Sequence, residues 1–231
     1  MPVFALQEEL IFPPPDFAEP DGLLAVGGDL SPQRILLAYS AGIFPWYSED
    51  SPILWWSPDP RLVLFPRELK ISRSMRQLLR KEVFRVTFDR AFEEVIKSCA
   101  SERRKDGEGT WLTEEMIDAY CGLHKMGYAH SVESWCGDEL AGGLYGISMG
   151  KVFFGESMFA KKSNASKAAF VTAVEKMKTE GCELIDCQVT TAHLRSFGAR
   201  EITREEFRDL LRRHIAAPAL IADDLRKKAV K

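Results

Sequence analysis

The pattern of apolar and polar positions is most regular in the second half of the chain. Short apolar runs follow one another there, and a turn containing glycine separates each run from the next: 129–135, 140–148 and 151–159. Runs of this length with tight turns between them predict an antiparallel meander of three strands. The pattern therefore predicts a sheet in this half of the chain.

A different pattern follows the third run. A polar loop at 160–163 leads into a helical repeat from about 164 to 178, and another short apolar run occupies 183–189. Two strands joined by a helix are expected to pair in parallel through a right-handed crossover, with ligands near the carboxyl ends of the strands. A buried polar group needs a reason to be there. Three polar residues interrupt these apolar runs: Glu156, Asp186 and Gln188.

The helices are predicted from apolar periodicity and from residues that suit helix ends. Ser31 and Pro32 suit the N-cap and the first position of a helix that ends near Gly42. Thr203 and Glu206 have the spacing of a capping box. Further helices are predicted at 70–81, 92–100 and 113–126, with a charged loop at 101–109.

These elements predict an α+β protein of two domains. A small N-terminal α/β domain is expected at 1–60, and a larger domain at 61–231 holds the meander and the strand–loop–helix–strand unit. This order resembles the core of the GNAT-type acyltransferase fold. The CoA-dependent enzymes of that fold have a glycine-rich cradle between strand and helix, whereas 160–166 contains no glycine. The likeness implies amide-forming acyl transfer in which CoA is not the donor.

The chain is not basic as a whole. It has 31 Lys and Arg against 34 Asp and Glu and a formal net charge of -3, so any contact with nucleic acid must come from a local patch. One such patch is predicted on the helix at 70–81, where Arg73, Arg76 and Arg80 form one stripe and Lys81 follows them. A solvated helix face and a surface for phosphate groups both fit this stripe.

The five cysteines form neither a CxxC pair nor a metal-ligand spacing with a histidine. An odd number without a framework predicts free thiols in a reducing compartment and no metal site. The N-terminal residues lack the basic and apolar regions of a secretory signal, and no apolar run approaches the roughly 20 residues that span a bilayer. We expect a cytoplasmic protein that does not enter a membrane, and we expect it to act as a monomer.

Tryptophans supply the candidate stacking surfaces. Trp46 follows a proline in a loop, and Trp111 stands at the end of the charged loop, just before a helix. A ring in such a place can stack on a nucleobase, a contact worth ~1–3 kcal/mol. Trp55 and Trp56 lie in an apolar run and are expected in the core of the small domain instead.

Eight stretches, in order along nearly the whole chain, resemble one family, the leucyl/phenylalanyl-tRNA–protein transferases. Several of them are long and unusual, which makes the likeness highly specific. They are GLLAVGGDLSP (22–32), GIFPWY (42–47), LWWSPDPR (54–61), ISRSM (71–75), GTWL (109–112), GESMF (155–159), NASK (164–167) and LIDCQ (184–188).

The resemblance implies an aminoacyltransferase. Leucine or phenylalanine, with methionine as a further candidate, would move from aminoacyl-tRNA to the α-amino group of a protein that begins with Arg or Lys. The new N-terminus would mark that protein for N-end-rule degradation. Because the aminoacyl ester is already activated, the resemblance implies no cofactor, neither ATP, metal nor CoA. The implied partners are charged tRNA and an acceptor protein.

The resemblance also implies roles for single residues. Trp46 and Trp111 match the rings that hold the 3′-terminal adenosine, and the basic stripe matches a tRNA-facing helix. The family has methionine where Leu144 stands and an aromatic residue where Ala173 stands, so the order of preference among the three donors stays open. The implied pocket for the donated side chain consists of Leu144, Phe153, Gly155, Met158, Ala173 and Ile185.

Asp186 and Gln188 match the catalytic pair of the family. Alternation along a strand places residues two apart on one face, so Asp186 is expected to hold the NH2 group of Gln188 while Gln188 contacts the attacking amine. Glu156 is expected to contact the ammonium or the cationic side chain of the acceptor. The amine proton has two open routes, a protein side chain or the ribose hydroxyl of the tRNA. The alternative for Asp186 is a purely structural carboxylate that holds the loop after Ser163.

Three other functions compete with this one. Another N-acyltransferase, dependent on aminoacyl-tRNA or acyl-CoA, would share the fold. A tRNA-binding module without chemistry would use the basic stripe and the two tryptophans, and it would leave Asp186 and Gln188 unexplained. A structural scaffold would leave the exposed tryptophans unexplained.

Overall fold

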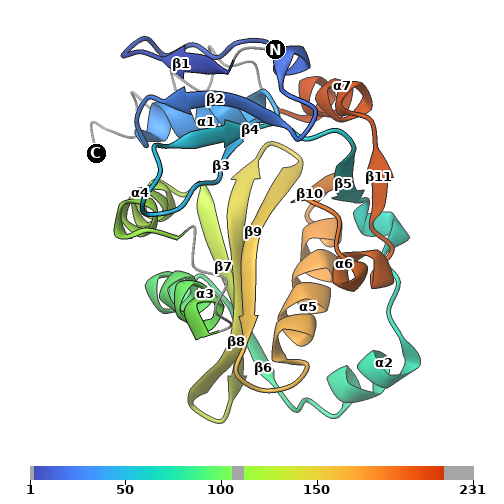
Figure 1. The fold of residues 1–231 in the computed structure, drawn as a ribbon. Coiled ribbons are helices and arrows are strands. Elements are labelled where there is room, and N and C mark those ends of the chain that lie inside the picture. Colours follow the sequence, from blue (N-terminus) through green and yellow to red (C-terminus); the bar gives the residue numbers. More distant parts are fainter. Residues whose placement is uncertain (1–2, 106–111, 216–231) are drawn as a thin grey trace.

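A small sheet and a large sheet organise the structure (Figure 1). The computed structural model describes residues 3–105 and 112–215. The small sheet holds, in hydrogen-bonded order, β1 (Phe4–Leu6), β2 (Leu23–Gly27), β4 (Leu54–Trp56) and β3 (Phe44–Pro45). The large sheet holds β11 (Arg200–Ile202), β5 (Arg61–Leu64), β10 (Leu184–Gln188), β9 (Val152–Ala160), β8 (Glu139–Met149), β7 (Ala129–Cys136) and β6 (Arg85–Phe88). Each sheet mixes parallel and antiparallel pairs, so the protein is mixed α/β.

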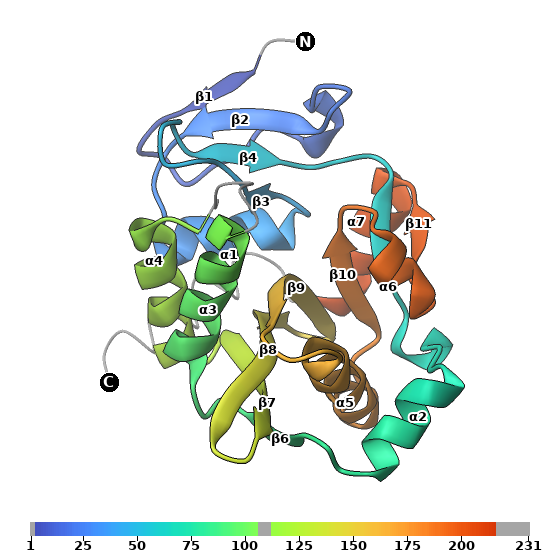
Figure 2. The ribbon, with the colours of Figure 1, turned by 60° about the horizontal axis from the view of Figure 1, so that its bottom comes forward.

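The centre of the large sheet has the predicted order. β7, β8 and β9 pair antiparallel, and helix α5 (Ala165–Thr179) then leads to β10, which pairs with β9 in parallel. The predicted meander and the predicted parallel pair are therefore confirmed. Helix α5 lies on one side of this sheet, and α3 (Phe92–Lys105) and α4 (Glu114–Lys125) lie on the other (Figure 1 and Figure 2).

Hydroxyl side chains explain where several helices begin. Ser31 accepts a hydrogen bond from the backbone N–H of Arg34 at the start of α1 (Pro32–Ser40), as predicted. Both halves of the predicted capping box, Thr203 and Glu206, are present at α7 (Arg204–His214). Each cap satisfies a backbone N–H that the first helical turn leaves without a partner. Threonines cap two more helices in the same way, α4 and α6 (Ala192–Ser196).

Two predicted helix boundaries were wrong. Helix α2 spans Arg73–Arg80 instead of starting at 70, because the hydroxyl of Ser72 accepts from the backbone N–H of Met75 and fixes the start there. Helix α3 continues to Lys105, although a charged loop was predicted from 101. Glu, Arg and Lys are good helix formers, so the charge of this stretch did not indicate a loop.

The prediction of two domains stays a prediction. The chain passes from the small sheet to the large one between Trp56 and Arg61, close to the predicted boundary. One apolar cluster nevertheless includes residues from both sides of that boundary. Within it, the ring of Tyr39 packs against the ring of Phe154 with centroids 5.0 Å apart. Trp55 is fully buried in this cluster, which confirms its predicted place in the core.

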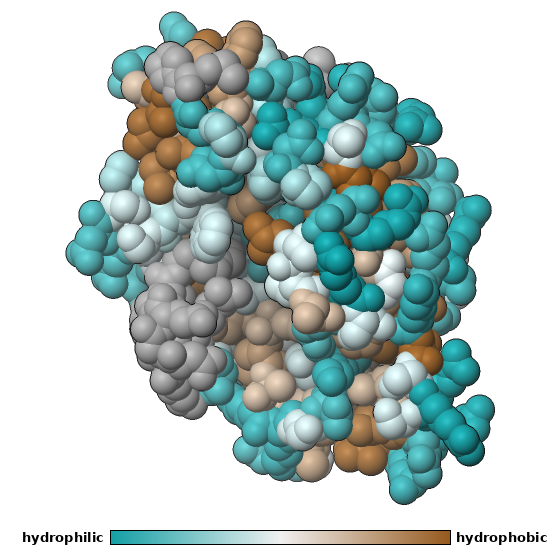
Figure 3. Space-filling model, turned by 45° about the vertical axis from the view of Figure 1, so that its right-hand side comes forward, coloured by the Kyte–Doolittle hydropathy of each residue, from teal (hydrophilic) through white to brown (hydrophobic). Residues whose placement is uncertain are grey.

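The face seen in Figure 3 is mostly hydrophilic, as expected when the apolar side chains are buried, and the apolar residues on it form separate patches. In the part of the chain that the structure describes, no helix is both long enough and apolar enough to cross a membrane.

Candidate active site

A cavity of about 310 Å³ lies between the end of the small sheet, strands β8 to β10 and helices α5 and α6. Nine of the residues singled out from the sequence line it: Trp46, Leu144, Phe153, Gly155, Glu156, Met158, Ile185, Asp186 and Gln188. Residues from strands β8, β9 and β10 and from the loop after β3 therefore meet in one hollow. Its walls differ in chemistry, and each is described below.

A β-bulge turns Glu156 into the cavity. The pairing of β8 with β9 passes from Tyr145 opposite Ser157 to Gly146 opposite Gly155, so Glu156 is the extra residue on its strand. The facing position allows only glycine, because a Cβ on Gly146 would come within 2.2 Å of the carbonyl oxygen of Phe154. This bulge gives a charged side chain a place in the cavity within an otherwise apolar strand.

A second bulge lies in the neighbouring strand. The pairing of β10 with β5 passes from Asp186 opposite Val63 to Gln188 opposite Leu62, which leaves Cys187 as the extra residue. Gln188 has a φ of 61°, the left-handed region that few side chains adopt. The parallel pairing of β10 with β9 ends at Asp186, and the two strands part beyond it. The bulges bring the Nε2 of Gln188 within 3.0 Å of Oε1 of Glu156.

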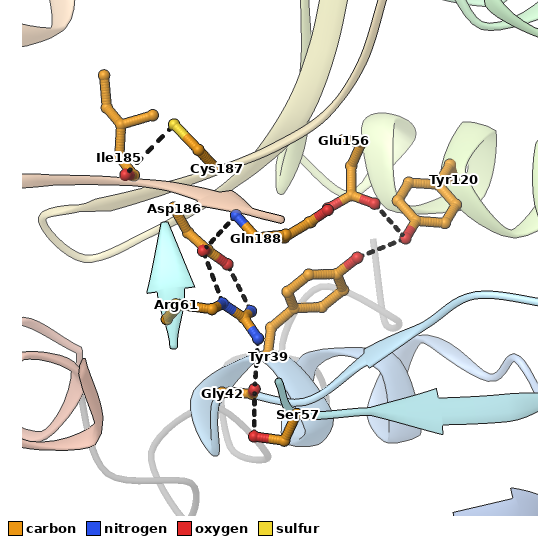
Figure 4. A network of polar contacts seen from close by, with 10 residues as sticks. All are labelled: Tyr39, Gly42, Ser57, Arg61, Tyr120, Glu156, Ile185, Asp186, Cys187 and Gln188. Carbon is orange, nitrogen blue, oxygen red and sulfur yellow. Dashed lines mark hydrogen bonds and ion pairs between the residues drawn. The ribbon is translucent and has the colours of Figure 1, made fainter. Parts of the chain in front are cut away.

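Asp186 is buried in an ion pair with Arg61 (Figure 4). The guanidinium donates from Nε to Oδ1 at 2.8 Å and from Nη2 to Oδ2 at 2.7 Å, and both side chains are at most 1% exposed. Arg61 also donates to the carbonyl of Gly42 at 3.2 Å and lies between the rings of Phe44 and Phe207. The pair ties strand β10 to the end of the small sheet.

Glu156 has neutral partners instead. The hydroxyl of Tyr120 donates to its Oε2 at 3.0 Å, and the hydroxyls of Tyr120 and Tyr39 lie 2.6 Å apart (Figure 4). Burial, and to a smaller extent the charge of Asp186, raise the pKa of Glu156 to about 7 against the lowering effect of its hydrogen bonds. Burial and the nearby Glu156 carboxylate raise the pKa of both tyrosines well above its usual value, so both stay protonated.

The predicted contact between Asp186 and the side chain of Gln188 was wrong. Glu156 accepts from the amide NH2 of Gln188, and Asp186 accepts from the backbone N–H of Gln188 at 2.9 Å. Regular alternation would place residues two apart on one face, but the bulge at Cys187 removes that alternation. The loop after Ser163 is not held by Asp186 either, because the hydrogen bonds that Asp186 accepts come from Arg61 and from the backbone of Gln188.

The opposite wall of the cavity is apolar. Leu144, Phe153, Met158 and Ile185 line it, as predicted. Helix α5 adds Phe170 and Met177, which the sequence placed only in the core. Ala173 lies between these two on the same stripe of α5 but is fully buried, and it is not among the lining residues. Its short side chain ends behind the wall, and its role in the donor pocket stays a prediction.

The two predicted stacking rings have different outcomes. Trp46 is 42% exposed, lines the cavity and packs against Trp56, with ring centroids 5.7 Å apart. The indole N–H of Trp56 donates to the carbonyl of Trp46 at 2.6 Å and fixes the backbone there. Trp111 lies outside the described residues.

The basic stripe is exposed to solvent. Arg73, Arg76, Arg80 and Lys81 all have exposed side chains. None of the four forms an ion pair among residues 3–105 and 112–215. Within the same residues, no group of three or more His, Cys, Asp or Glu side chains is arranged to hold a metal ion.

Sequence reasoning missed three residues that support the carboxylates of the cavity from behind, namely Arg61, Tyr39 and Tyr120. Arg61 had one signal, because it begins an apolar run that predicts a buried strand. The tyrosines had none, since their partner Glu156 lies far from both in the sequence. Only the packing of α1 against α4, and of α4 against β7 of the large sheet, brings them together.

A mixed α/β fold whose cavity has an apolar wall facing a buried carboxylate and an amide suits a group-transfer protein, because such a cavity can hold an apolar group beside a polar reacting group. The sequence profile of the leucyl/phenylalanyl-tRNA protein transferases matches residues 63–212, and that of their N-terminal domain matches residues 28–59. The chain therefore belongs to the leucyl/phenylalanyl-tRNA protein transferase family.

Two relatives agree with this assignment. The leucyl/phenylalanyl-tRNA–protein transferase of Syntrophobacter fumaroxidans is 64% identical, over 93% of this chain and 92% of that protein. The transferase of the same name from an Anaeromyxobacter species is 59% identical, over 95% of this chain and 94% of that protein. Among solved structures, L-PGS from Bacillus licheniformis has a TM-score of 0.42 and 12% identity, covering 73% of this chain and 54% of that chain.

Proposed function

We propose that this protein moves leucine or phenylalanine from aminoacyl-tRNA to the α-amino group of proteins that begin with Arg or Lys. The modified N-terminus then marks the product for N-end-rule degradation. One observation carries the proposal: in a chain of this family, apolar side chains that leave room for a leucine or phenylalanine side chain line the same cavity as Glu156 and Gln188. Such a cavity can hold an apolar acyl group beside an incoming amine.

The donor occupies the apolar side. Leu144, Phe153, Met158 and Ile185 surround the leucine or phenylalanine side chain, together with Phe170 and Met177. Methionine side chains are flexible, so the two in this wall adapt to an aliphatic or an aromatic group. The same adaptability admits methionine as a third donor. The exposed ring of Trp46 stacks on the 3′-terminal adenosine, and Trp111 supplies a second ring.

The acceptor amine approaches the polar side. The α-amino group of a peptide has a pKa of about 8, so a useful fraction is neutral at pH 7. Because the NH2 of Gln188 is held by Glu156, its amide oxygen is left to accept a hydrogen bond from the amine. The pair of Asp186 with Arg61 fixes the backbone that carries this amide. The ester is already activated, so placing the two substrates together supplies much of the rate.

The tRNA body meets the basic stripe. Arg73, Arg76 and Arg80 project from one helix without ionic partners among the described residues, and Lys81 extends the stripe. Cations without acidic partners are free to bind phosphate groups, and such binding weakens steeply with salt. This source of affinity fits a chain whose net charge is negative.

The remaining assignments follow from the same identity. The meander of β7, β8 and β9, followed by α5 and β10, is a GNAT-like core, and the boundary between the domains lies near residue 60. The enzyme acts as a monomer in the cytoplasm, where charged tRNA is made.

The test is a transfer assay with purified protein, labelled leucyl-tRNA or phenylalanyl-tRNA, and peptides that differ only in the N-terminal residue. Label should pass to peptides beginning with Arg or Lys without added ATP, metal or CoA. Peptides beginning with Asp or Glu should receive none. Transfer to acidic N-termini, or tRNA binding without any transfer, would replace this proposal with a different specificity or with a binding module.

A further inference from the structure

The two carboxylates of the polar wall have different partners. Asp186 accepts three hydrogen bonds, two from Arg61 and one from the backbone N–H of Gln188. A carboxylate bound in this way by a guanidinium has both oxygens occupied by charge-assisted hydrogen bonds. It is also fully buried beneath Arg61, away from solvent. Its charge is already bound to Arg61, so Asp186 is better suited to holding the site together than to taking the proton of a substrate.

Gln188 cannot keep a proton either. Its side chain is a neutral amide, which accepts hydrogen bonds through its oxygen but is not a base at neutral pH. The assignment of its two ends is fixed by its partner, since only the NH2 group can donate to the carboxylate of Glu156. The oxygen of the amide therefore orients the amine, and another group must take the proton.

Glu156 has the properties that the other two lack. Its oxygens accept from the neutral NH2 of Gln188 and the neutral hydroxyl of Tyr120. Among the residues that the structure describes, no Lys, Arg or His forms an ion pair with it. It lines the cavity and is 9% exposed, so a ligand can reach it. The bulge at Glu156 brings its Oε1 beside the amide of Gln188.

We propose that Glu156 is the general base of the transfer reaction, which takes the proton from the attacking α-amine and returns it to the leaving ribose oxygen. This inference rests on the proposed function. The amine nitrogen bonds to the ester carbonyl carbon and loses one proton to Glu156. The carbon–oxygen bond to the ribose then breaks, the ribose oxygen takes that proton, and Glu156 returns to its starting charge.

The surroundings of Glu156 support this role. Tyr39 on α1 and Tyr120 on α4 donate toward it, while Asp186 on β10, with its partner Arg61 on β5, lies on the other side. Burial raises the pKa of Glu156 to about 7, close to the working pH, where a general base is most effective. The other titratable side chains that line the cavity are Tyr145, Cys187 and His193.

The first experiment compares Glu156→Gln with the wild-type enzyme across pH. Below pH 6, log kcat/KM of the wild-type enzyme should rise with a slope of about two, because both Glu156 and the acceptor amine must lose a proton. Glu156→Gln should lower kcat at pH 8 by roughly 100-fold or more, the usual loss on removing a general base. Its slope should fall to about one, since only the amine still titrates.

Tyr120→Phe tests the same ionisation by a small change. It removes the hydroxyl that donates to Glu156 but keeps the ring in its place. Because hydrogen bonds to the carboxylate lower its pKa, losing one raises the pKa of Glu156, and the acid limb should move to higher pH. A residue that only supported the fold would leave the position of this limb unchanged.

The rival role for Glu156 is recognition of the cationic side chain of the acceptor. Peptides that begin with arginine or with citrulline, its neutral isostere, separate the two roles. If Glu156 is a general base, its loss lowers the rate with both peptides by the same factor. Glu156→Gln should therefore keep the wild-type ratio of the rates with the arginine peptide and the citrulline peptide. Loss of the preference for arginine, with a slope that stays near two, would overturn the proposal.

The pH dependence of the free energy of unfolding needs no substrate, so it can be measured even if a variant is inactive for other reasons. The pKa of Glu156 rises from 4.5 to about 7 on folding, so the folded state holds a proton that the unfolded state releases in this window. The free energy of unfolding should therefore fall as pH rises from about 4.5 to about 7, and Glu156→Gln should make this fall smaller. If the wild-type enzyme transfers no leucine or phenylalanine at all, the proposed function fails; if it transfers but its slope is unchanged in Glu156→Gln, only the role of Glu156 fails.

Discussion

The two walls of the cavity are built in different ways. The apolar wall consists of side chains on regular strand and helix, such as Ile185 on β10 and Met177 on α5. The polar wall exists only where the strands stop being regular, at the bulges next to Glu156 and Gln188. The comparison shows that regular structure supplies the space for an apolar group, whereas departures from it place the reacting groups.

The walls also differ in what stabilises them. Apolar side chains at the first wall gain from burial regardless of which neighbour covers them. The second wall depends on particular partners, because Asp186 without Arg61 would be an uncompensated buried charge. We therefore expect the polar wall to tolerate substitution poorly and the apolar wall to respond mainly through selectivity.

The largest expected effect follows from removing Arg61. Arg61→Ala leaves Asp186 buried without a counter-charge, which should lower the free energy of unfolding by about 3–5 kcal/mol. The matched control is Arg200→Ala. Arg200 also pairs with a carboxylate, Glu68, and lies over a ring, but it is 51% exposed. Its loss should cost no more than about 1 kcal/mol. Equal losses in urea unfolding would show that the burial of the Arg61 pair has no special importance.

A smaller effect should separate the walls by kinetics. Gln188→Ala removes the amide that orients the amine, so kcat should fall roughly 10- to 100-fold, equivalent to about 1.5–3 kcal/mol. The ratio of leucine to phenylalanine transfer should stay the same, because the apolar wall is intact. A change in that ratio would mean that Gln188 also shapes the donor pocket.

Met177→Ala should do the opposite. It enlarges the pocket at the apolar wall, so the ratio of leucine to phenylalanine transfer should move toward phenylalanine by about 1–2 kcal/mol. The pH dependence of kcat should stay as in the wild-type enzyme. Lys178→Ala is the control, since Lys178 is the next residue on α5 and is exposed. Competition between leucyl-tRNA and phenylalanyl-tRNA in one reaction measures the ratio directly. An unchanged ratio in Met177→Ala would remove Met177 from the donor pocket.

The residues of the apolar wall were predicted from the family resemblance, and the strands that carry them from apolar runs and turns. The meander and the parallel pair place Phe153 and Ile185 opposite each other in the sheet. Ala173 shows the limit of this reasoning. Periodicity assigns it to the correct stripe of α5, but it does not show that so short a side chain ends behind the wall.

The polar wall was predicted only in part. Glu156, Asp186 and Gln188 stand out because they interrupt apolar runs, but the contacts among them depend on bulges that apolar patterning does not reveal. A bulge shifts a side chain to the other face of a strand, so the expected partner of the Gln188 amide was wrong. Arg61 reaches Asp186 across 125 residues of chain, a pairing that no local pattern contains.

The smallest expected effect tests a residue that belongs to neither wall. Trp46 comes from the small sheet, is 42% exposed and lies at the cavity. The terminal adenosine is common to every charged tRNA. If the ring of Trp46 holds it, Trp46→Ala should weaken the binding of leucyl-tRNA and of phenylalanyl-tRNA by the same factor. We expect about 1 kcal/mol, the low end for base stacking, because the ring already packs against Trp56. The effect should fall on KM for the tRNA, with kcat and the donor ratio kept.

The control for Trp46 is Trp46→Phe, which retains an aromatic face and should recover part of the lost affinity. A donor-dependent loss in Trp46→Ala would instead place the ring against the aminoacyl side chain and join Trp46 to the apolar wall. A lower kcat in Trp46→Ala would show that Trp46 acts beside the reacting groups of the polar wall. Measuring KM, kcat and the donor ratio for these variants therefore assigns Trp46 to the adenosine or to one of the walls, because each location changes a different quantity.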